Sequence, residues 1–560
     1  MKKKRVKNNK LKNGELKIVP LGGLSEIGLN CTAFEYDDSI IVVDAGLMFP
    51  EDSMHGVDYV IPDLSWLTEN AVKIKALFVT HGHEDHTGAI PYLLQSVNVP
   101  VYGTSLTIGL IAKKLQEFKG LEHRKLITIK PREKLKIGKF LIEPIRVTHS
   151  IIDAVSYGIK TPVGTVLITG DFKIDMTPVG EKLDFERFSA YGAEGVDVLL
   201  SDSTNSLRPG HTPSEKLVGK AFENLFPKIK GRILIVTFAS NVNRIQQVVD
   251  VAIKNGRKIC ITGKSMVKNC EIAEELGYLK IPKASMVGVK SINELDDNKI
   301  AIITTGSQGE PMSVLSRIVN DEHKTIKARH GDTVIISSNA IPGNERSVAA
   351  VVNMLYKKGV DVIYEENAFV HVSGHASSDE LKMMMSITKP KNLFPVHGEY
   401  RMRARLAELA SQVGIDGKNI IMADNGDLVS LSGKGEIKIL GKVKTGRVFI
   451  KEKNPSSIDL NIIKQRNKLA SNGIVFITIS VDDIKESLAI SSKAIGFLTK
   501  ELFDEFKTDI ENRAADKYLK LLREKIDLET ALMKINRDIS KFISKKTGFS
   551  PFVETTVFHR

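Results

Sequence analysis

The sequence has few cysteines and no long apolar run, and each shortage excludes a class of protein. Its 560 residues contain three cysteines, Cys31, Cys260 and Cys270, and no CxxC pair. So few cysteines in so long a chain exclude a disulfide framework and fit a reducing cytosol. No apolar run approaches the roughly 18 residues of a membrane span, and no apolar segment follows the charged N-terminus as in a signal peptide. We therefore expect a cytoplasmic protein without a membrane partner.

Negative charge is also in short supply. Lys and Arg number 80 against 67 Asp and Glu, which gives a net charge of +13. An excess of this size favours a polyanionic partner such as a nucleic acid, although a Lys-rich composition that only keeps the protein soluble explains it equally well. Residues 1–14 are the most basic stretch, and we expect a disordered tail there.

The length predicts several domains. From about residue 208 to 370 apolar strands alternate with helices, which predicts a small parallel α/β domain; its strands are expected at 233–238, 258–262, 300–305, 333–337 and 360–364. Near the end, strands are expected at 473–481, 488–497 and 549–558, with helices at 499–524 and 526–546. This last part carries no cluster of ligands and reads as an appendage for oligomerisation or RNA binding.

The stretch from Thr80 to His86, Thr-His-Gly-His-Glu-Asp-His, carries the strongest chemical signal. It follows the apolar run 76–79, which reads as a buried strand, and it precedes a helix expected at 87–97. Burying so many polar groups without a metal would leave costly unpaired atoms. Imidazole and carboxylate together suit zinc and similar divalent ions. The stretch therefore predicts a metal-dependent hydrolase.

Other predicted strands also end in ligands. His149 follows the strand 141–147, Asp171 follows 165–169, and His397 follows the apolar run 394–396. With the first stretch they form a set for two ions, about 3.5–4 Å apart, which can clamp an attacking hydroxide and polarise a phosphoryl centre. We expect His81, His83 and His149 at one ion, Asp85, His86 and His397 at the other, and Asp171 as a bridge. Asp44 ends the strand 39–43 and could orient a ligand.

With these residues in place, the chain resembles the metallo-β-lactamase superfamily and, within it, the β-CASP nucleases, most closely the bacterial ribonuclease J family. The HxHxDH motif at 81–86 belongs to the whole superfamily, whereas Asp202, His375 and His397 occupy the three β-CASP positions. The runs GDFK at 170–173, SDSTN at 201–205 and PVHGEY at 395–400 look like the ribonuclease J family itself. The resemblance extends from about Leu16 through the C-terminal appendage.

The resemblance implies an α/β fold: a metallo-β-lactamase αββα sandwich with an inserted β-CASP α/β domain and a small C-terminal α/β domain. After the tail at 1–14, the first domain would occupy 15–207 and 371–445, with the β-CASP domain inserted at 208–370. Residues 446–454 would be a linker and 455–560 a C-terminal oligomerisation domain.

The resemblance also implies the activity. The family consists of zinc-dependent ribonucleases with 5′→3′ exonuclease activity that favours a 5′-monophosphate, and with endonuclease activity, acting in mRNA decay and in rRNA and RNA maturation. Two zinc ions per subunit are implied, with manganese or magnesium as alternatives. RNA would enter the cleft between the domains. A homodimer or homotetramer would form through the C-terminal domain, and a paralogous subunit, the ribosome or an RNA-decay complex are further candidate partners.

A phosphate pocket and an acid–base pair follow from the same resemblance. The pocket would be formed by His371, Val372, Ser373, Gly374 and His375, assisted by Ser240, Asn241 and Val242, although ordinary helix capping uses the same kinds of residue. His375, oriented by Asp202, would donate a proton to the leaving oxygen, and Asp85 could accept one. Two positions depart from the family pattern: Asn243 stands where many members have histidine, and Lys264 where arginine is usual.

Three alternatives remain open at this point. A small-molecule hydrolase such as a lactamase or thioesterase fits the metal motif, but not the inserted domain or the basic charge. A β-CASP nuclease acting on DNA would fit the same residues, and only the closer likeness to the ribonuclease J family favours RNA over DNA. A non-catalytic partner subunit of an RNA-decay complex is disfavoured by the complete set of ligands.

Overall fold

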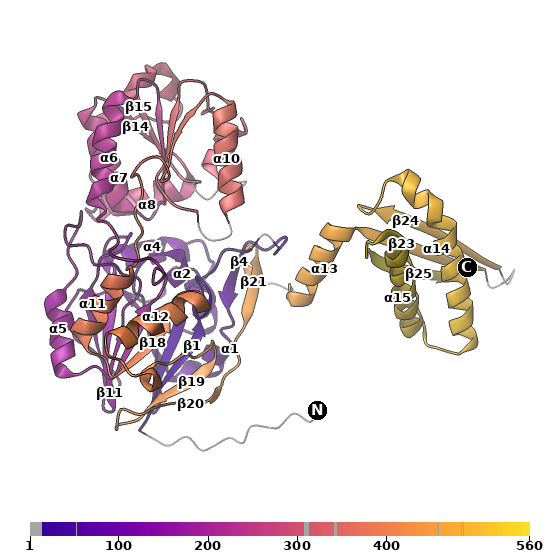
Figure 1. Cartoon of the computed structure of the whole chain (residues 1–560), viewed down its shortest axis with the longest axis horizontal. Helices are drawn as coiled ribbons and strands as arrows, with labels where there is room; N and C mark the ends of the chain where they lie inside the picture. Colours follow the sequence, from indigo (N-terminus) through magenta and orange to yellow (C-terminus); the bar gives the residue numbers. More distant parts are fainter. Residues whose placement is uncertain are drawn as a thin grey trace. The chain divides into compact units, whose positions relative to one another are not determined.

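A computed structural model describes residues 14–51, 53–306, 313–340, 344–455, 458–482, 484 and 487–559. It divides into two compact units, Met1–Phe49 with Tyr59–Val448, and Pro50–Asp58 with Phe449–Arg560 (Figure 1). All but the last residue of the predicted basic tail lies outside the described residues. No described helix combines the length and the apolar character that crossing a membrane requires.

Two β-sheets packed face to face form the centre of the first unit. The larger has eight strands in the order β20 (Ile437–Lys442), β19 (Asp427–Leu431), β1 (Leu16–Gly22), β2 (Cys31–Tyr36), β3 (Ser39–Val43), β5 (Ile74–Phe78), β6 (Val101–Gly103) and β7 (Leu126–Thr128). The smaller has six strands in the order β18 (Asn392–Val396), β12 (Val198–Asp202), β11 (Gly164–Ile168), β10 (Val155–Thr161), β9 (Phe140–Arg146) and β8 (Leu135–Ile137).

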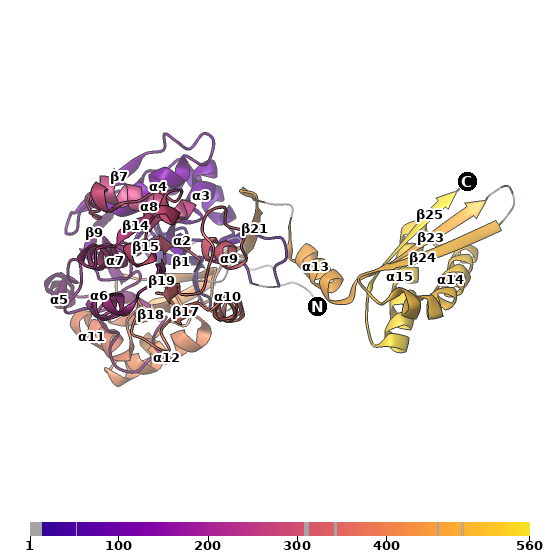
Figure 2. The ribbon, with the colours of Figure 1, turned by 90° about the horizontal axis from the view of Figure 1, so that it is seen from above.

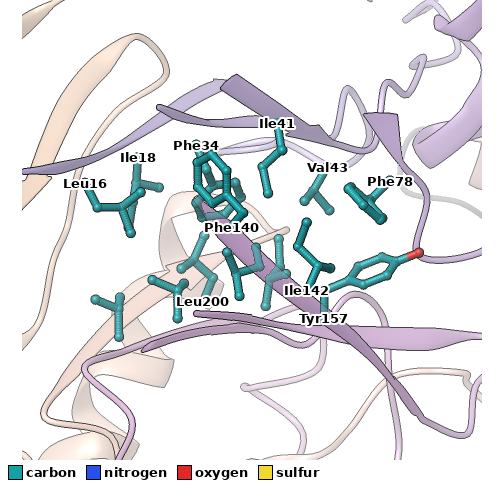
Figure 3. Packing of buried hydrophobic residues seen from close by; sticks show 14 of the residues in the cluster. Leu16, Ile18, Phe34, Ile41, Val43, Phe78, Phe140, Ile142, Tyr157 and Leu200 are labelled. Carbon is teal, nitrogen blue, oxygen red and sulfur yellow. The ribbon is translucent and has the colours of Figure 1, made fainter. Parts of the chain in front are cut away.

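The apolar residues between these sheets form one core (Figure 3). Val43 and Phe78 reach it from the larger sheet, and Phe140 and Ile142 reach it from the smaller one, all buried. Tyr157 packs edge-on against Phe78 with ring centroids 5.4 Å apart. Its hydroxyl donates a 2.7 Å hydrogen bond to the carbonyl of Val79. This bond fixes the smaller sheet against the end of β5, where the metal-binding motif begins.

Helices cover the outer faces and complete the predicted αββα order. On the smaller sheet, α5 (Phe185–Glu194), α11 (Ser378–Thr388) and α12 (Tyr400–Gln412) enclose a second apolar cluster. On the larger sheet, α4 (Ser105–Leu115) contacts β6 and β7, and α3 (Ile90–Ser96) contacts α4. Each sheet thus buries one face against the other sheet and one against helices. The predicted α/β fold class is confirmed.

A parallel five-stranded sheet lies within the residues 208–370 that we expect to form an inserted domain (Figure 1). Its order is β14 (Lys258–Ile261), β15 (Ile300–Thr304), β13 (Ile233–Val236), β16 (Thr333–Ile336) and β17 (Asp361–Ile363). Apolar clusters lie on both faces, as the uninterrupted apolar strands require. Its helices are α6 (Lys216–Leu225), α7 (Val242–Lys254), α8 (Lys264–Glu275), α9 (Val314–Val319) and α10 (Glu345–Lys357).

The chain leaves and re-enters the six-stranded sheet between two neighbouring strands. β12 and β18 pair in parallel, with Leu199 opposite Leu393 and Asp202 opposite Val396. Residues almost 200 positions apart in sequence therefore end their strands side by side. This pairing places the residues after β12 next to His397.

The structure corrects one expectation and adds detail to a second. The helix predicted at 87–97 is two helices, α2 (Glu84–Thr87) and α3, because Pro91 has no N–H to continue the hydrogen bonding of α2 and is instead accommodated in the first turn of α3. The stretch 446–454, predicted as a linker, contains the strand β21 (Arg447–Lys451), whose Phe449 and Ile450 are buried.

The second unit has a three-stranded sheet in the order β24 (Ser487–Ile495), β23 (Ile474–Asp482) and β25 (Phe552–His559). β23 pairs antiparallel with β24 and parallel with β25. The helices α14 (Lys500–Arg523) and α15 (Leu528–Thr547) pack on one face of this sheet, over Val475, Ile477 and Ile479 (Figure 2). α13 (Leu460–Asn472) precedes it. The strands and helices predicted for this part are confirmed to within a few residues.

Candidate metal centre

Most of the predicted ligands follow directly from strands of the two central sheets. His81 and His83 continue from β5, and Asp85 and His86 lie on the short helix α2. His149 follows β9, Asp171 follows β11 and His397 follows β18. Each ends a buried strand at the same end of the sandwich, so the fold brings together side chains that are more than 300 residues apart in sequence.

The first ligand group consists of His81, His83, His149 and Asp171. His83 Nδ1 lies 3.1 Å from His81 Nε2 and 3.2 Å from His149 Nε2. Asp171 Oδ2 lies 3.7 Å from the Nε2 atoms of both His81 and His149. A tetrahedral zinc ion with bonds of about 2.0–2.1 Å keeps its ligand atoms about 3.3–3.4 Å apart. The four atoms already stand near that spacing.

The second group consists of Asp85, His86, Asp171 and His397. Asp85 Oδ2 lies 3.2 Å from His397 Nε2 and 3.5 Å from His86 Nε2. His86 Nε2 is also 3.3 Å from Asp171 Oδ2. Asp171 therefore belongs to both groups, as a bridging carboxylate must.

The Asp171 carboxylate tests whether a cation fits here. Asp171 is 2% exposed, and its buried Oδ1 atom accepts no hydrogen bond in the described structure, although His397 Nδ1 lies 3.4 Å away. A buried carboxylate oxygen without a hydrogen bond is costly. It lies among side chains that all serve divalent metals, and a cation coordinated by them would satisfy it. The donor set thus fits metal ions.

Two kinds of histidine meet at the site. Burial and neighbouring imidazoles lower the pKa of His81 and His149 well below its ordinary value, and that of His83 to about 4. These rings are neutral, which is the form that binds metal. Burial alone would lower the pKa of His397, but nearby carboxylates, above all Asp171, raise it to about 10. The carboxylates therefore give the second group the more negative surroundings of the two.

Asp44 supports His86, in the place where we expected it to orient a ligand. Asp44 Oδ2 accepts a 2.8 Å hydrogen bond from His86 Nδ1. The same carboxylate accepts from the Thr80 backbone N–H at 2.8 Å and from the Thr80 hydroxyl at 2.9 Å. These bonds orient the ring so that His86 Nε2 lies 3.5 Å from Asp85 and 3.3 Å from Asp171, with Asn30 Nδ2 3.1 Å away. Asp44 has a φ of +61°, a conformation that Asp tolerates better than most residues.

The carbonyl of Gly374 supports His149, and sequence reasoning missed this contact. His149 Nδ1 donates a 2.7 Å hydrogen bond to it. A Cβ atom on Gly374 would lie 2.6 Å from His149 Cε1 and 2.7 Å from Nδ1. The glycine thus permits the loop to rest on a predicted metal ligand. The small residues Ser373 and Gly374 are the only feature of the sequence that points to this loop, and we interpret them there as part of a phosphate pocket.

His375 and Asp202 form the pair that we predicted. Asp202 Oδ2 accepts from His375 Nδ1 at 2.8 Å. Burial alone would lower the pKa of His375, but Asp202 and Asp171 raise it. Thr204 is an addition to the predicted set: its hydroxyl lies 2.7 Å from Asp202 Oδ1 and 2.8 Å from His397 Nδ1, so it connects this pair to the second ligand group.

The predicted phosphate-binding residues come from two segments that the structure brings together. Ser240, Asn241 and Val242 lead into α7, with the Asn241 side chain accepting from the Arg244 N–H at 3.1 Å. The loop of His371, Val372, Ser373, Gly374 and His375 crosses nearby, because the Arg244 guanidinium lies 2.9 Å from His371 Nδ1. The two departures, Asn243 and Lys264, lie in the first turns of α7 and α8.

Three family models match the chain. They are the metallo-beta-lactamase superfamily over residues 26–183, the ribonuclease J beta-CASP domain over 230–355, and the Zn-dependent metallo-hydrolase RNA specificity domain over 359–422.

The chain is also similar to known proteins over most of its length. It is 45% identical to ribonuclease J of Helicobacter pylori (strain ATCC 700392 / 26695) over 87% of this chain and 71% of that protein. It is 39% identical to ribonuclease J of Thermus thermophilus over 96% and 94%, and 39% identical to ribonuclease J2 of Bacillus subtilis 168 over 88% of each. A crystal structure of a protein of unknown function from Enterococcus faecalis V583 shares the fold, with a TM-score of 0.55, 16% identity, and coverage of 74% of this chain and 100% of that one.

Proposed function

Because the chain belongs to the ribonuclease J family and is a metal-dependent nuclease, we propose that it digests RNA as a 5′→3′ exonuclease that prefers a 5′-monophosphate, and that it also cuts RNA internally. The cellular roles that we propose are mRNA decay and the maturation of rRNA and other RNA. Three buried cysteines without disulfides fit our assignment of the activity to the cytoplasm.

One observation carries this proposal: two ligand groups share Asp171, and the His375–Asp202 pair stands beside them. We propose that His81, His83 and His149 hold one zinc ion, that Asp85, His86 and His397 hold a second, and that Asp171 bridges them. Imidazole-rich sites suit zinc, although manganese and magnesium accept some of the same ligands. Ions bound there would lower the pKa of a water molecule and offset charge on the scissile phosphate.

The protein's own groups would manage the protons. Asp85 Oδ2 faces the second ligand group with a partly exposed side chain, so it could receive the proton of the attacking water. Because Asp202 accepts from His375 Nδ1, the opposite nitrogen of the ring is left for the substrate. We assign to His375 the donation of a proton to the leaving oxygen, and to Asp202 the orientation of His375.

The loop at 371–375 and residues 240–242 would receive the 5′-phosphate. The Ser373 hydroxyl is held by Asn205 Nδ2 at 2.8 Å and by the His375 N–H at 3.2 Å, so the loop has a defined shape. α7 begins at Val242, and the N-terminus of a helix favours anions. We further propose a homodimer or homotetramer formed through residues 455–560, with a paralogous subunit, the ribosome or an RNA-decay complex as additional partners.

The decisive experiment digests one RNA prepared with a 5′-monophosphate, a 5′-triphosphate or a 5′-hydroxyl, with and without a chelator. We expect mononucleotides to be released fastest from the monophosphate, internal cuts with all three, and no cleavage under chelation. Equal exonucleolytic rates for the three ends would refute the 5′-end preference. A DNA of the same sequence, degraded as fast as the RNA, would favour the alternative of a DNA nuclease.

A further inference from the structure

Arg244 is a fully buried cation, and neighbouring groups direct four of its five N–H donors. Its Nε and Nη2 atoms donate to the two oxygens of Glu215, at 2.8 and 2.7 Å. Its Nη1 atom donates to the Ser337 carbonyl at 2.6 Å and lies 2.9 Å from His371 Nδ1. The carboxylate of Glu215 and the carbonyl of Ser337 fix the plane of the guanidinium. The second N–H on Nη1 therefore has a fixed direction as well, towards His371 Nδ1.

This contact determines which nitrogen of His371 carries the proton. A guanidinium has only N–H donors and accepts no hydrogen bond. His371 Nδ1 must therefore accept, and the ring proton must reside on Nε2. An imidazolium carries protons on both nitrogens, so protonation of His371 would break the contact with Arg244. The hydrogen bonds seen among the described residues engage the Nδ1 side of the ring, which leaves Nε2 able to donate to a ligand.

The charged groups around His371 act in the same direction. Arg244 faces it from α7, and Arg208 and Lys173 are also close enough to oppose a positive charge on the ring. Burial is the largest effect and, with these cations, lowers the pKa of His371 well below the ordinary value. The Ser337 carbonyl would favour a proton on the ring, but it already accepts from Arg244 at 2.6 Å. The carboxylate of Glu215, on the other side of Arg244, is already paired with both edges of that guanidinium.

We propose that Arg244 is a positioning residue for the recognition of the 5′ end: it holds His371 as the neutral tautomer that donates from Nε2 to the terminal phosphate. Phosphate oxygens only accept hydrogen bonds, so the ring must offer a donor to them. Arg244 lies in the first turn of α7, directly after the Ser240–Val242 segment, so one side chain connects the two halves of the phosphate pocket. This inference rests on the proposed function of that pocket.

The test replaces Arg244 by methionine and measures one ratio, kcat/KM for RNA with a 5′-monophosphate divided by that for a 5′-hydroxyl, between pH 5.5 and 8. A phosphate monoester titrates near pH 6 by itself, so each variant is compared with the unmodified protein at the same pH. We expect Arg244→Met to lower the ratio about tenfold near pH 8, which corresponds to one hydrogen bond to a charged group. As the pH falls the loss should shrink, because His371 can then gain a proton.

Arg232, which directly precedes β13 in the same α/β region of the chain, offers a matched control. It is 1% exposed and donates to both oxygens of Asp332, at 2.8 and 2.7 Å, but it contacts no residue of the pocket in the described structure. Arg232→Met should disturb folding in a similar way and leave the ratio unchanged. Should the unpaired Glu215 prevent Arg244→Met from folding, Arg244→Met with Glu215→Gln and Arg232→Met with Asp332→Asn form the matching double variants.

Two variants of His371 itself give an independent readout. The amide nitrogen of glutamine reaches about where Nε2 lies, whereas the shorter asparagine replaces only the Nδ1 side of the ring. We expect His371→Gln to keep a monophosphate preference several-fold greater than that of His371→Asn. An Asn variant as selective as the Gln variant would overturn the proposal, as would Arg244 variants that match the Arg232 controls at every pH. An unmodified protein without any 5′-end preference would instead refute the proposed function beneath it.

Discussion

Replacing Gly374 by alanine should weaken metal binding at His149, a residue that the substitution does not change. The new Cβ atom would lie 2.6 and 2.7 Å from two atoms of the His149 ring and 2.8 Å from Ser150 Oγ, whereas ordinary contacts lie at 3.4–4 Å. The ring or the loop must therefore move by roughly 0.8 Å. A movement of the loop would also displace the carbonyl that accepts from His149 Nδ1 at 2.7 Å.

The size of this displacement decides the outcome. Metal–ligand distances tolerate about 0.2 Å, and loss of a supporting hydrogen bond typically costs about 10–100-fold in metal affinity. We expect Gly374→Ala to lower the affinity for the ion that we propose at His81, His83 and His149 by at least that factor. The ion that we propose at Asp85, His86 and His397 should be affected less, because the nearest neighbours of Gly374 are His149 and Ser150.

The assay is zinc content per chain, measured by mass spectrometry after equilibration in chelator-buffered zinc, with thermal unfolding as a check of folding. Gly288→Ala is the control, because a Cβ atom there meets no atom within 4 Å. His149→Ala sets the largest effect that can arise. If His149→Ala loses an ion while Gly374→Ala binds zinc like the control, the loop is not rigid and the reasoning fails. If His149→Ala loses none, His149 is not a ligand.

Three further predictions follow from the same contacts. Asp44→Asn should lower the affinity for the ion that we propose at His86 about 10–100-fold in a zinc titration, because Asn cannot replace all three hydrogen bonds of the carboxylate. Asp37→Asn, at another position with a left-handed backbone conformation, should leave that affinity unchanged. His375→Ala should reduce RNA cleavage about 10²–10⁴-fold with normal metal content; full activity would disprove its role as the acid. Removing the metal with EDTA should lower the thermal unfolding temperature. An ion at 1,000 times its Kd stabilises the native state by about 4 kcal/mol. An unchanged unfolding temperature in metal-stripped protein would count against a buried metal site.

Sequence reasoning identified side chains that the fold brings together, because these side chains lie at strand ends. His81, His149, Asp171 and His397 each follow an apolar run that is easily recognised as a strand, and such ends meet at one edge of an α/β fold. Strands with a weaker pattern escaped: β10 contains Ser156, Gly158 and Lys160 among its apolar residues. The break between α2 and α3 escaped too, although Pro91 marks it in the sequence.

The groups that orient the ligands could not be found in this way. Gly374 is 225 residues from His149, and Thr204 is 193 residues from His397. A backbone carbonyl leaves no mark in the sequence, since every residue has one. Arg244 could be read only as a charged residue on a helix, and its importance arises from Glu215 and His371, which only the folded chain places around it. Ligand types follow local pattern, whereas tautomers and orientations follow tertiary contacts.

The loop at 371–375 unites these contacts, and this bears on how the protein could act at a 5′ end. Its first residue accepts from Arg244, its fourth supplies the carbonyl that holds His149, and its fifth donates to Asp202. A phosphate bound along such a loop would stand at a fixed distance from the ligands and from the proton donor. That distance would determine which phosphodiester bond lies at the metal centre. A rigid loop therefore suits removal of one nucleotide at a time. Inserting one glycine after Val372 should change the size of the released product, or abolish exonucleolytic cleavage while internal cuts persist. If chromatography of the products shows unchanged release of mononucleotides, the loop does not set the position of cleavage.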